Sequence, residues 1–452
     1  MYGIILLAVY ALVMIALTFR DKATTDRQFN VAYRNIGPYS GALSIAATWI
    51  WAPALFVSAE KAYSWGWQGL AWFLIPNILC LMIFSPFANK IRDLFPNGVT
   101  LSGFMQERLK SKAVGNTYRF QLGSLAMLST AVQLLAGSKI LSVITGIPFA
   151  IMTIILALIA YSYSRKSGIL ASIKTDALQM ILILGICAVA VPWAISAKGL
   201  SSVFAGLHGV KSMGAWEIFI GFGLPTTIGL ISGPFGDQNF WQRAFSIKRW
   251  HVKDSFILGA ILFGLVPLSM GVLGFIACGS GFMANDSGYV NFELIKAVLP
   301  AWFIVPFLFM VVSGLLSTVD SNLCAISSLV SDIKGGLKAA RISMLVLLSL
   351  GIAIANIPKI TVTDLFLFYG TLRASTLLPT LLTLLGKKLH PKGVTAGIIL
   401  GLLVGLPTFA YGSICGVLEA KLIGSLITLL VPGVIAVVHT REMECADENG
   451  QG

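Results

Sequence analysis

Residues 217–243 read EIFIGFGLPTTIGLISGPFGDQNFWQR, an apolar stretch that could lie within a membrane and yet is rich in helix-breaking residues. It contains Pro225 and Pro234 together with five glycines. Proline removes a backbone hydrogen bond from a helix, and glycine lowers the cost of leaving helical dihedral angles. At membrane depth, released backbone groups are tolerated only where they are buried in protein or face a wet cavity. The stretch therefore predicts a discontinuous helix.

A second interrupted span lies earlier, where residues 41–67 read GALSIAATWIWAPALFVSAEKAYSWGW with Pro53 near the middle. Either span alone is equally compatible with a simple kink, because glycine and proline are common in membrane helices. Each interrupted span, however, opens a block of five predicted spans, and an odd number of crossings inverts the second block. Paired interruptions at matching places in two halves are typical of a transporter with its site near the bilayer midplane.

The composition excludes an ordinary soluble protein. Hydrophobic residues make up 56% of the chain and charged residues 11%, against about 25% charged residues in soluble domains. We predict an all-α integral membrane protein with about 13 transmembrane helices, a 5+5 inverted repeat, and discontinuous first and sixth core helices. The predicted spans are 2–19, 40–63, 66–88, 120–143, 147–164, 168–195, 214–236, 254–279, 298–330, 342–357, 361–386, 393–411 and 418–438.

These spans divide the chain into five parts. The first span is interpreted as a retained helix, because no small-residue cleavage site follows it. The polar tail after His439 is predicted to be disordered. Six cysteines show no CxxC spacing, so neither a zinc site nor a disulfide framework is expected. The parts are an extra helix and cytoplasmic loop (1–39), the first five-helix repeat (40–195), the second, inverted repeat (214–386), two C-terminal helices (387–438) and a cytoplasmic tail (439–452).

The chain has a net charge of +13, and its basic residues are distributed among the loops in a pattern that indicates topology. Lysine and arginine gather in alternate loops, whereas the intervening loops hold scattered lysines. This positive-inside pattern predicts an outside N-terminus and a cytoplasmic C-terminus in the cell membrane. The basic balance therefore requires no nucleic-acid partner. The basic loops cover residues 20–34, 90–112, 165–166, 243–253, 334–341 and 387–392.

Four motifs follow in order along the chain, and together they resemble the sodium:solute symporter family over nearly its whole length. The resemblance implies the leucine-transporter-type fold and symport of a small solute with an ion. The segments TWIWA and GDQNFWQRAF are most similar to the urea-type branch of the family. The motifs are DRQFNVAYRNIGPYSGALS (26–44), YSRKSGILASIKTDALQ (163–179), GDQNFWQRAFSIK (236–248) and LLSTVDSNLCAISSLVSD (315–332).

Hydroxyl groups are concentrated in the last motif at membrane depth. Gly314, Ser317, Thr318 and Ser321 share one helix face, at i, i+3, i+4 and i+7. The resemblance implies a sodium ion between this helix and the broken first core helix. The implied ligands are the carbonyls of Ala46, Trp49 and Gly314 and the hydroxyls of Ser317 and Thr318. For Ser327 and Ser328 we favour the alternative that the hydroxyls only bridge helices.

Asp320 needs a separate account, because a carboxylate within a membrane span must be paired, protonated or exposed to a cavity. The resemblance implies a possible second ion site formed by Asp176, Ser317, Asp320 and Ser321. A salt bridge from Asp320 to Lys174 or another cytoplasmic-side base is the alternative. The number of coupling ions is left open.

The resemblance also implies a substrate site beside the two breaks. The implied residues are Thr48, Trp51, Pro53, Asp237, Gln238 and Trp241. Trp49, Trp51, Phe219, Phe222 and Phe240 form either an aromatic box or ordinary packing. Asp237 either holds a polar group of the substrate or pairs with Arg243 as a gate, which is the interpretation we favour. Arg373 is the basic residue at membrane depth that would suit an anionic solute.

The sequence thus predicts a secondary active transporter that couples inward sodium flux to uptake of a small polar solute, urea-like in preference, by alternating access. The alternatives are a sodium-coupled monocarboxylate or sialate-like symporter and a proton-coupled carrier that uses Asp176 or Asp320. The expected partners are the solute, sodium as the coupling ion and the lipid bilayer, with no other cofactor. Four histidines and the lack of an HExxH or GxSxG motif argue against an enzyme.

Overall fold

The computed structural model describes residues 2–333 and 335–448. Residue 334 of the predicted basic loop and residues 449–452 of the predicted tail lie outside the described residues. Within the described ranges every extended regular element is a helix, and a parallel bridge joins Ile36 to Ile247. The prediction of an all-α protein is confirmed.

The chain order of the α-helices is as follows. The first half contains α1 (Tyr2–Thr18), α2 (Asp26–Val31), α3 (Pro38–Trp49), α4 (Ala52–Leu55), α5 (Val57–Leu94), α6 (Leu101–Arg108), α7 (Lys112–Thr145), α8 (Phe149–Ser167), α9 (Ile169–Lys198) and α10 (Leu200–Ala205). The second half contains α11 (Ala215–Ile218), α12 (Leu224–Ile231), α13 (Gly233–Gly236), α14 (Gln238–Ser246), α15 (Val252–Gly279), α16 (Val290–Val298), α17 (Ile304–Ser331), α18 (Leu337–Ala355), α19 (Val362–Ala374), α20 (Leu377–Leu384), α21 (Pro391–Cys415) and α22 (Leu418–Glu448).

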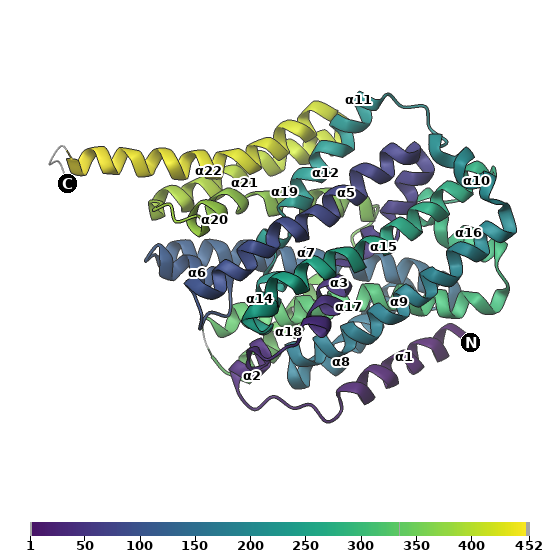
Figure 1. Cartoon of the computed structure of the whole chain (residues 1–452), viewed down its shortest axis with the longest axis horizontal. Helices are drawn as coiled ribbons and strands as arrows, with labels where there is room; N and C mark the ends of the chain where they lie inside the picture. The colour runs from purple at the N-terminus through teal and green to yellow at the C-terminus, as the bar shows by residue number, and fades with distance from the viewer. Residues whose placement is uncertain (1, 334, 449–452) are drawn as a thin grey trace.

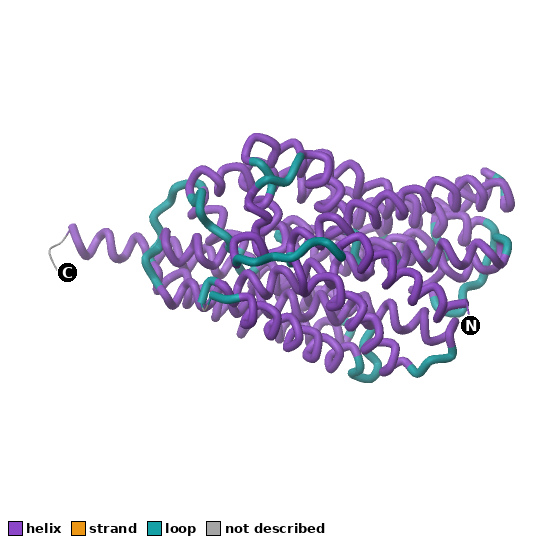
Figure 2. The backbone as a smooth tube through the Cα atoms, turned by 90° about the horizontal axis from the view of Figure 1, so that it is seen from below, coloured by secondary structure: helices purple, strands orange, loops and turns teal. Residues whose placement is uncertain are grey.

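Most of the long helices run along the long axis of the molecule (Figure 1, Figure 2). At its centre α3 packs against α9, α15 and α17. In Figure 1 the paired helices α21 and α22 lie along one edge of the bundle, and α1 lies along the opposite edge. The first half of the broken helix at residues 38–49 is thus enclosed by other helices.

Ten helical segments in the described part of the chain are long and apolar enough to cross a membrane. Two shorter apolar helices accompany them, Gly3–Thr18 and Ala215–Ile231. The end of the second predicted span and the whole third span share the long helix α5, inside which Gly66 has non-helical angles (φ 62°, ψ −145°). A Cβ at Gly66 would lie 1.9 Å from the carbonyl oxygen of Leu207, so this bend requires glycine.

Both predicted interruptions are present, at positions slightly different from the prolines. Ile50 and Trp51 leave helical geometry between α3 and α4, and Pro53 lies in the first turn of α4. In the second interrupted span Asp237 is extended (φ −108°, ψ 123°) between α13 and α14. Pro234 lies in the first turn of α13, whereas Pro225 closely follows the π-helical turn Phe219–Gly223 within the continuous helical segment Ala215–Ile231. Pro53 and Pro234 therefore lie in the first turns of short helices, and none of the three prolines occupies the extended residues of a break.

The C-terminal segment differs from its prediction. α22 continues as a helix to Glu448, whereas disorder is predicted after His439. Residues 441–448 read REMECADE, and arginine, glutamate, methionine and alanine all have high helix propensity. The polar composition that suggested disorder is therefore equally compatible with extension of the preceding helix.

Candidate functional site

Thr318 on α17 faces the break between α3 and α4. Its hydroxyl oxygen lies 3.3 Å from the carbonyl oxygen of Ile50 and 3.4 Å from those of Thr48 and Gly314. Thr318 is buried, as are all three residues whose carbonyls it approaches. Three carbonyl oxygens thus lie within 3.4 Å of one buried hydroxyl oxygen, two of them from the end of α3 and the break and one from the preceding turn of α17. An alkali cation prefers ligands of this kind.

The other two predicted carbonyl ligands lie in the last turn of α3. The carbonyl of Ala46 accepts a hydrogen bond from the amide of Ile50 at 3.0 Å, and that of Trp49 from the amide of Trp51 at 3.2 Å. Because a carbonyl oxygen has two lone pairs, each retains one for a further ligand. Gly314 and Thr318 lie one turn apart on α17, and the carbonyls of Thr48 and Ile50 lie beside the Thr318 hydroxyl; the sodium assignment stays a prediction.

Ser317, next to Thr318 on α17, contacts a buried carboxylate. Its hydroxyl donates a hydrogen bond of 2.6 Å to Oδ1 of Asp176 on α9. A serine hydroxyl that donates its proton keeps its lone pairs for a cation or another donor. Asp176 therefore orients Ser317.

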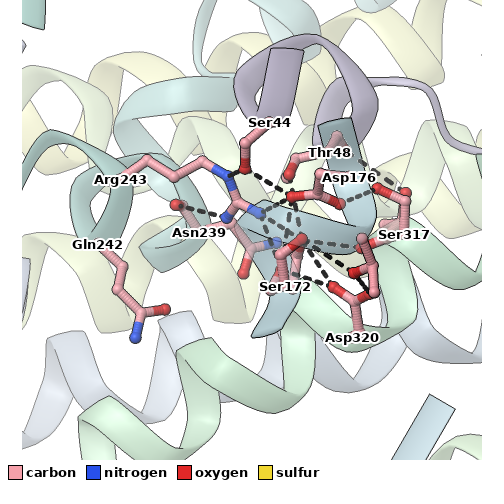
Figure 3. Close-up of polar contacts among 12 residues, drawn as sticks. Ser44, Thr48, Ser172, Asp176, Asn239, Gln242, Arg243, Ser317 and Asp320 are labelled. Atoms are coloured by element: carbon pink, nitrogen blue, oxygen red, sulfur yellow. Dashed lines mark hydrogen bonds and ion pairs between the residues drawn. The ribbon is translucent and has the colours of Figure 1, made fainter. Parts of the chain in front are cut away.

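Arg243 on α14 forms a buried ion pair with Asp176 (Figure 3). Its Nη2 lies 2.8 Å from Oδ2 of Asp176 and 2.7 Å from the hydroxyl of Ser321. Its Nε donates to the hydroxyl of Ser44 at 2.9 Å, and Ser44 donates to Asp176 at 2.5 Å. Both members of the ion pair have side-chain exposures of 0%. The predicted pairing of Arg243 with Asp237 is therefore wrong.

Asp320 lies beside this ion pair and receives hydroxyl donors. Tyr163 donates to its Oδ2 at 2.9 Å and Ser172 to its Oδ1 at 2.6 Å. The predicted alternative, a salt bridge to Lys174, is wrong. Lys174 pairs with Asp21 near the surface at 2.7 Å. The reason is geometric. Asp176 faces α17, the helix that carries Asp320. Lys174 lies two residues from Asp176 on α9, and residues at that spacing point to different sides of a helix.

Asp237 pairs with Arg373 on α19 rather than with Arg243. Both of its carboxylate oxygens also accept from the hydroxyl of Tyr369, at 2.9 Å. The extended backbone at Asp237 directs the carboxylate toward α19, whereas Arg243 lies in the second turn of α14 and reaches α9. The guanidinium carbon of Arg373 lies 5.0 Å from the ring centroid of Trp51. A neutral, buried ion pair thus borders the first break.

The predicted aromatic box is divided between two places. Trp49 contacts Trp51 and Phe240, with ring centroids 6.2 Å and 5.0 Å away. Phe222 contacts Trp65 instead, and Phe219 contacts Trp72. Only the first group lies at the break in α3, beside the Asp237–Arg373 pair.

The remaining predicted substrate residues have other contacts. Gln238 accepts from the amide of Leu101 and donates to Ser328 and to the carbonyl of Val99, so its side-chain oxygen and nitrogen both have protein partners. The indole of Trp241 donates to the carbonyl of Phe235. Pro53 is buried in α4, and the hydroxyl of Thr48 lies 3.1 Å from that of Ser321. The structure gathers Thr48, Trp51 and Asp237 near the break, and it places Gln238 and Trp241 in helix-anchoring contacts.

Sequence reasoning missed several polar residues that complete these clusters. They are Ser44, Gln133, Tyr163, Ser172 and Tyr369. The sequence contains the same signal for each of them, because each is a polar side chain in an otherwise apolar predicted span. Their partners lie on helices far away in sequence, so only the fold reveals their roles.

Gln133 is one of these residues, and its contact with the first residue of α4 yields a prediction. Its Oε1 accepts the amide of Ala52, the first residue of α4, at 2.7 Å. We expect Gln133→Leu to lower the free energy of unfolding by about 1–3 kcal/mol, because a buried amide loses its acceptor. The measurement is the melting temperature of the purified protein in detergent. Gln121→Leu on the same helix is the matched control, since its described bond is a long contact of 3.4 Å. Equal melting temperatures for the two variants would contradict the capping role.

Comparisons with known proteins identify the family. The model of the sodium:solute symporter family matches residues 29–401. A urea-proton symporter from rice (Oryza sativa subsp. japonica) is 22% identical over 91% of this chain and 66% of its own length. A sodium/proline symporter from Staphylococcus aureus is 27% identical over 90% of this chain and 86% of its own length. The chain thus spans slightly less than two thirds of the rice protein. Both relatives are transporters and not enzymes.

A solved structure shares the fold. It is the substrate-bound, outward-open state of a Na⁺-coupled sialic acid symporter, with a TM-score of 0.76 and 16% identity, covering 97% of this chain and 98% of that one. At this identity the likeness concerns the fold alone, and it agrees with the fold that the motifs predict. With ten membrane-length helices among its described residues, the protein is a multi-pass membrane protein. Since the family model covers most of its length, the chain belongs to the sodium:solute symporter family.

Proposed function

We propose that this protein is a secondary active transporter that couples inward sodium flux to uptake of a small, neutral, polar solute of the urea type. The observation that carries the proposal is the position of the Thr318 hydroxyl, within 3.3–3.4 Å of the carbonyl oxygens of Thr48 and Ile50 at the break after α3. A hydroxyl oxygen and the carbonyl oxygens of unwound backbone together offer a cation several ligands that carry no formal charge.

The proposed sodium ligands are drawn from both sides of the break. Ser317 and Thr318 supply hydroxyls, and Gly314 supplies a carbonyl. From the other side come the carbonyls of Ala46 and Trp49, with Thr48 and Ile50 next to them. A cation here would join α17 to α3, and movement of the two helices apart would dismantle the site.

The charge of the substrate site supports a neutral solute. Arg373 was the reason to consider an anionic solute, but Asp237 neutralises it. An anionic solute would bring a second negative charge next to the Asp237 carboxylate in a buried environment, which is costly. Nε and Nη1 of Arg373 and Nε1 of Trp51 are buried donors without a described protein acceptor. A carbonyl oxygen such as that of urea would accept from at most two of them. The sodium-coupled monocarboxylate or sialate-like symporter is therefore the second choice.

Proton coupling is the other alternative, and Asp320 favours it. The hydrogen-bond partners described for this buried carboxyl are hydroxyl groups, and the described ion pairs do not include it. A carboxyl in such surroundings at membrane depth is a candidate proton carrier. The rice relative is itself named a urea-proton symporter.

The architecture completes the proposal. We assign thirteen crossings, an outside N-terminus, a cytoplasmic C-terminus and a 5+5 inverted repeat over 40–195 and 214–386, with alternating access between the two halves.

The driving force is sufficient for uptake. One charge crossing 100 mV contributes about 2.3 kcal/mol, and a tenfold sodium gradient adds about 1.4 kcal/mol. Together they would concentrate a neutral solute about 500-fold.

The test is uptake into proteoliposomes of labelled urea, lactate, sialate and proline, with and without an inward sodium gradient. We expect urea uptake that requires sodium and that is lost in Ser317→Ala. Uptake of lactate or sialate instead of urea would support the second choice. Urea uptake without sodium, driven by an inward proton gradient, would support proton coupling. Uptake of none of these solutes would contradict the substrate class.

A further inference from the structure

We infer that Arg243 is a built-in cation that occupies a second oxygen-rich chamber, so that this chamber takes no transported metal ion. The inference deepens the proposed function, since it concerns the number of ions that accompany the solute.

The chamber is lined by the oxygen atoms that an alkali cation would use. Two carboxylates and four hydroxyls converge from three helices, and all of them are buried. A set of this kind would suit a sodium ion well. The lining residues are Ser44 on α3, Ser172 and Asp176 on α9, and Ser317, Asp320 and Ser321 on α17.

The guanidinium of Arg243 lies inside this set (Figure 3). Its Nη2 is 2.8 Å from Asp176, 2.7 Å from Ser321 and 3.3 Å from Ser172. Nε donates to Ser44 at 2.9 Å, and Nη1 donates to the carbonyl of Asn239 at 3.2 Å. All three nitrogens are therefore engaged, and Nη2 lies among the oxygens that a metal ion would need.

The charges favour a resident cation. A buried carboxyl group that is ionised needs a partner of opposite charge, and Arg243, whose side chain stays protonated, supplies it to Asp176, whereas the described partners of Asp320 are hydroxyl groups. Because Arg243 belongs to α14, its charge cannot leave with the solute. The chamber shares only Ser317 with the proposed sodium ligands at the break, so the two places can act separately. We therefore expect one transported sodium ion per solute.

The experiment counts bound ions directly. Purified wild-type protein in detergent is equilibrated with radioactive sodium, and bound sodium is measured per protein at saturation. We expect one ion for the wild type and two for Arg243→Gln, because the uncharged amide vacates the chamber. Arg243→Lys, which keeps a cation, is the matched control and should bind one. Adding Asp176→Asn to Arg243→Gln should remove the gained ion.

Two results would overturn the inference: two ions bound by the wild type, or no gain in an Arg243→Gln variant that elutes as a folded protein. Should that variant not fold, the wild-type count still decides. The flux ratio of sodium to solute in wild-type proteoliposomes gives an independent reading, with a ratio of two also overturning it. A failure of the proposed function gives a different result. A wild type that binds no sodium and shows no sodium-dependent uptake would refute sodium coupling at the break. The gain of a bound ion in Arg243→Gln would still test the chamber.

Discussion

Asp237→Ala is expected to abolish solute uptake and to lower the free energy of unfolding by about 3–5 kcal/mol. The Asp237 and Arg373 side chains are only 5% and 2% exposed, so removing the carboxylate leaves a guanidinium buried without its counter-charge. The penalty for an isolated buried charge exceeds the net gain from the intact pair. The measurements are the melting temperature in detergent and uptake in proteoliposomes.

A double variant separates stability from transport in this prediction. Asp237→Ala combined with Arg373→Met removes both charges, and we expect it to recover most of the lost stability. Uptake should stay absent, because the donors of Arg373 beside Trp51 are also missing. Recovery of uptake in the double variant would show that the pair serves folding alone. An Asp237→Ala protein as stable as the wild type would contradict the electrostatic argument.

Thr318→Ala is expected to raise the sodium concentration for half-maximal uptake by roughly 10- to 100-fold. The Thr318 hydroxyl oxygen lies 3.4 Å from the carbonyl oxygen of Thr48 and 3.3 Å from that of Ile50 at the break. Loss of one interaction with a charged group costs about 1.5–3 kcal/mol, and each 1.4 kcal/mol changes an affinity about tenfold. The measurement is the sodium dependence of urea uptake at a fixed membrane potential.

Two controls accompany this variant. Thr318→Ser keeps the hydroxyl and should retain sodium affinity close to that of the wild type. Ser327→Ala removes another buried hydroxyl from α17, one that donates to the carbonyl of Cys324 at 2.7 Å, and it should leave the sodium dependence unchanged. An unaltered sodium requirement in Thr318→Ala, or an equal change in Ser327→Ala, would place the ion elsewhere.

The sequence by itself determined the class of protein. Long apolar spans leave few alternatives to membrane helices, because unpaired backbone groups are too costly in lipid. The glycines and prolines of residues 41–67 and 217–243 predicted two interruptions, which are found at Ile50–Trp51 and at Asp237. The hydroxyls of Ser317 and Thr318 could be singled out because polar groups at membrane depth need a reason to be there. These conclusions rest on local properties of the chain.

Only the tertiary structure decided which charges meet. From the sequence, Arg243 was assigned to Asp237 in the same segment, and Lys174 was one candidate partner for Asp320. In the structure Arg243 pairs with Asp176, and Asp237 pairs with Arg373, across 67 and 136 residues of sequence. A buried charge pairs with whatever opposite charge the rotation and packing of several helices bring within reach, and composition or spacing does not encode that rotation. The same holds for Gln133, whose role depends on where α7 passes the start of α4.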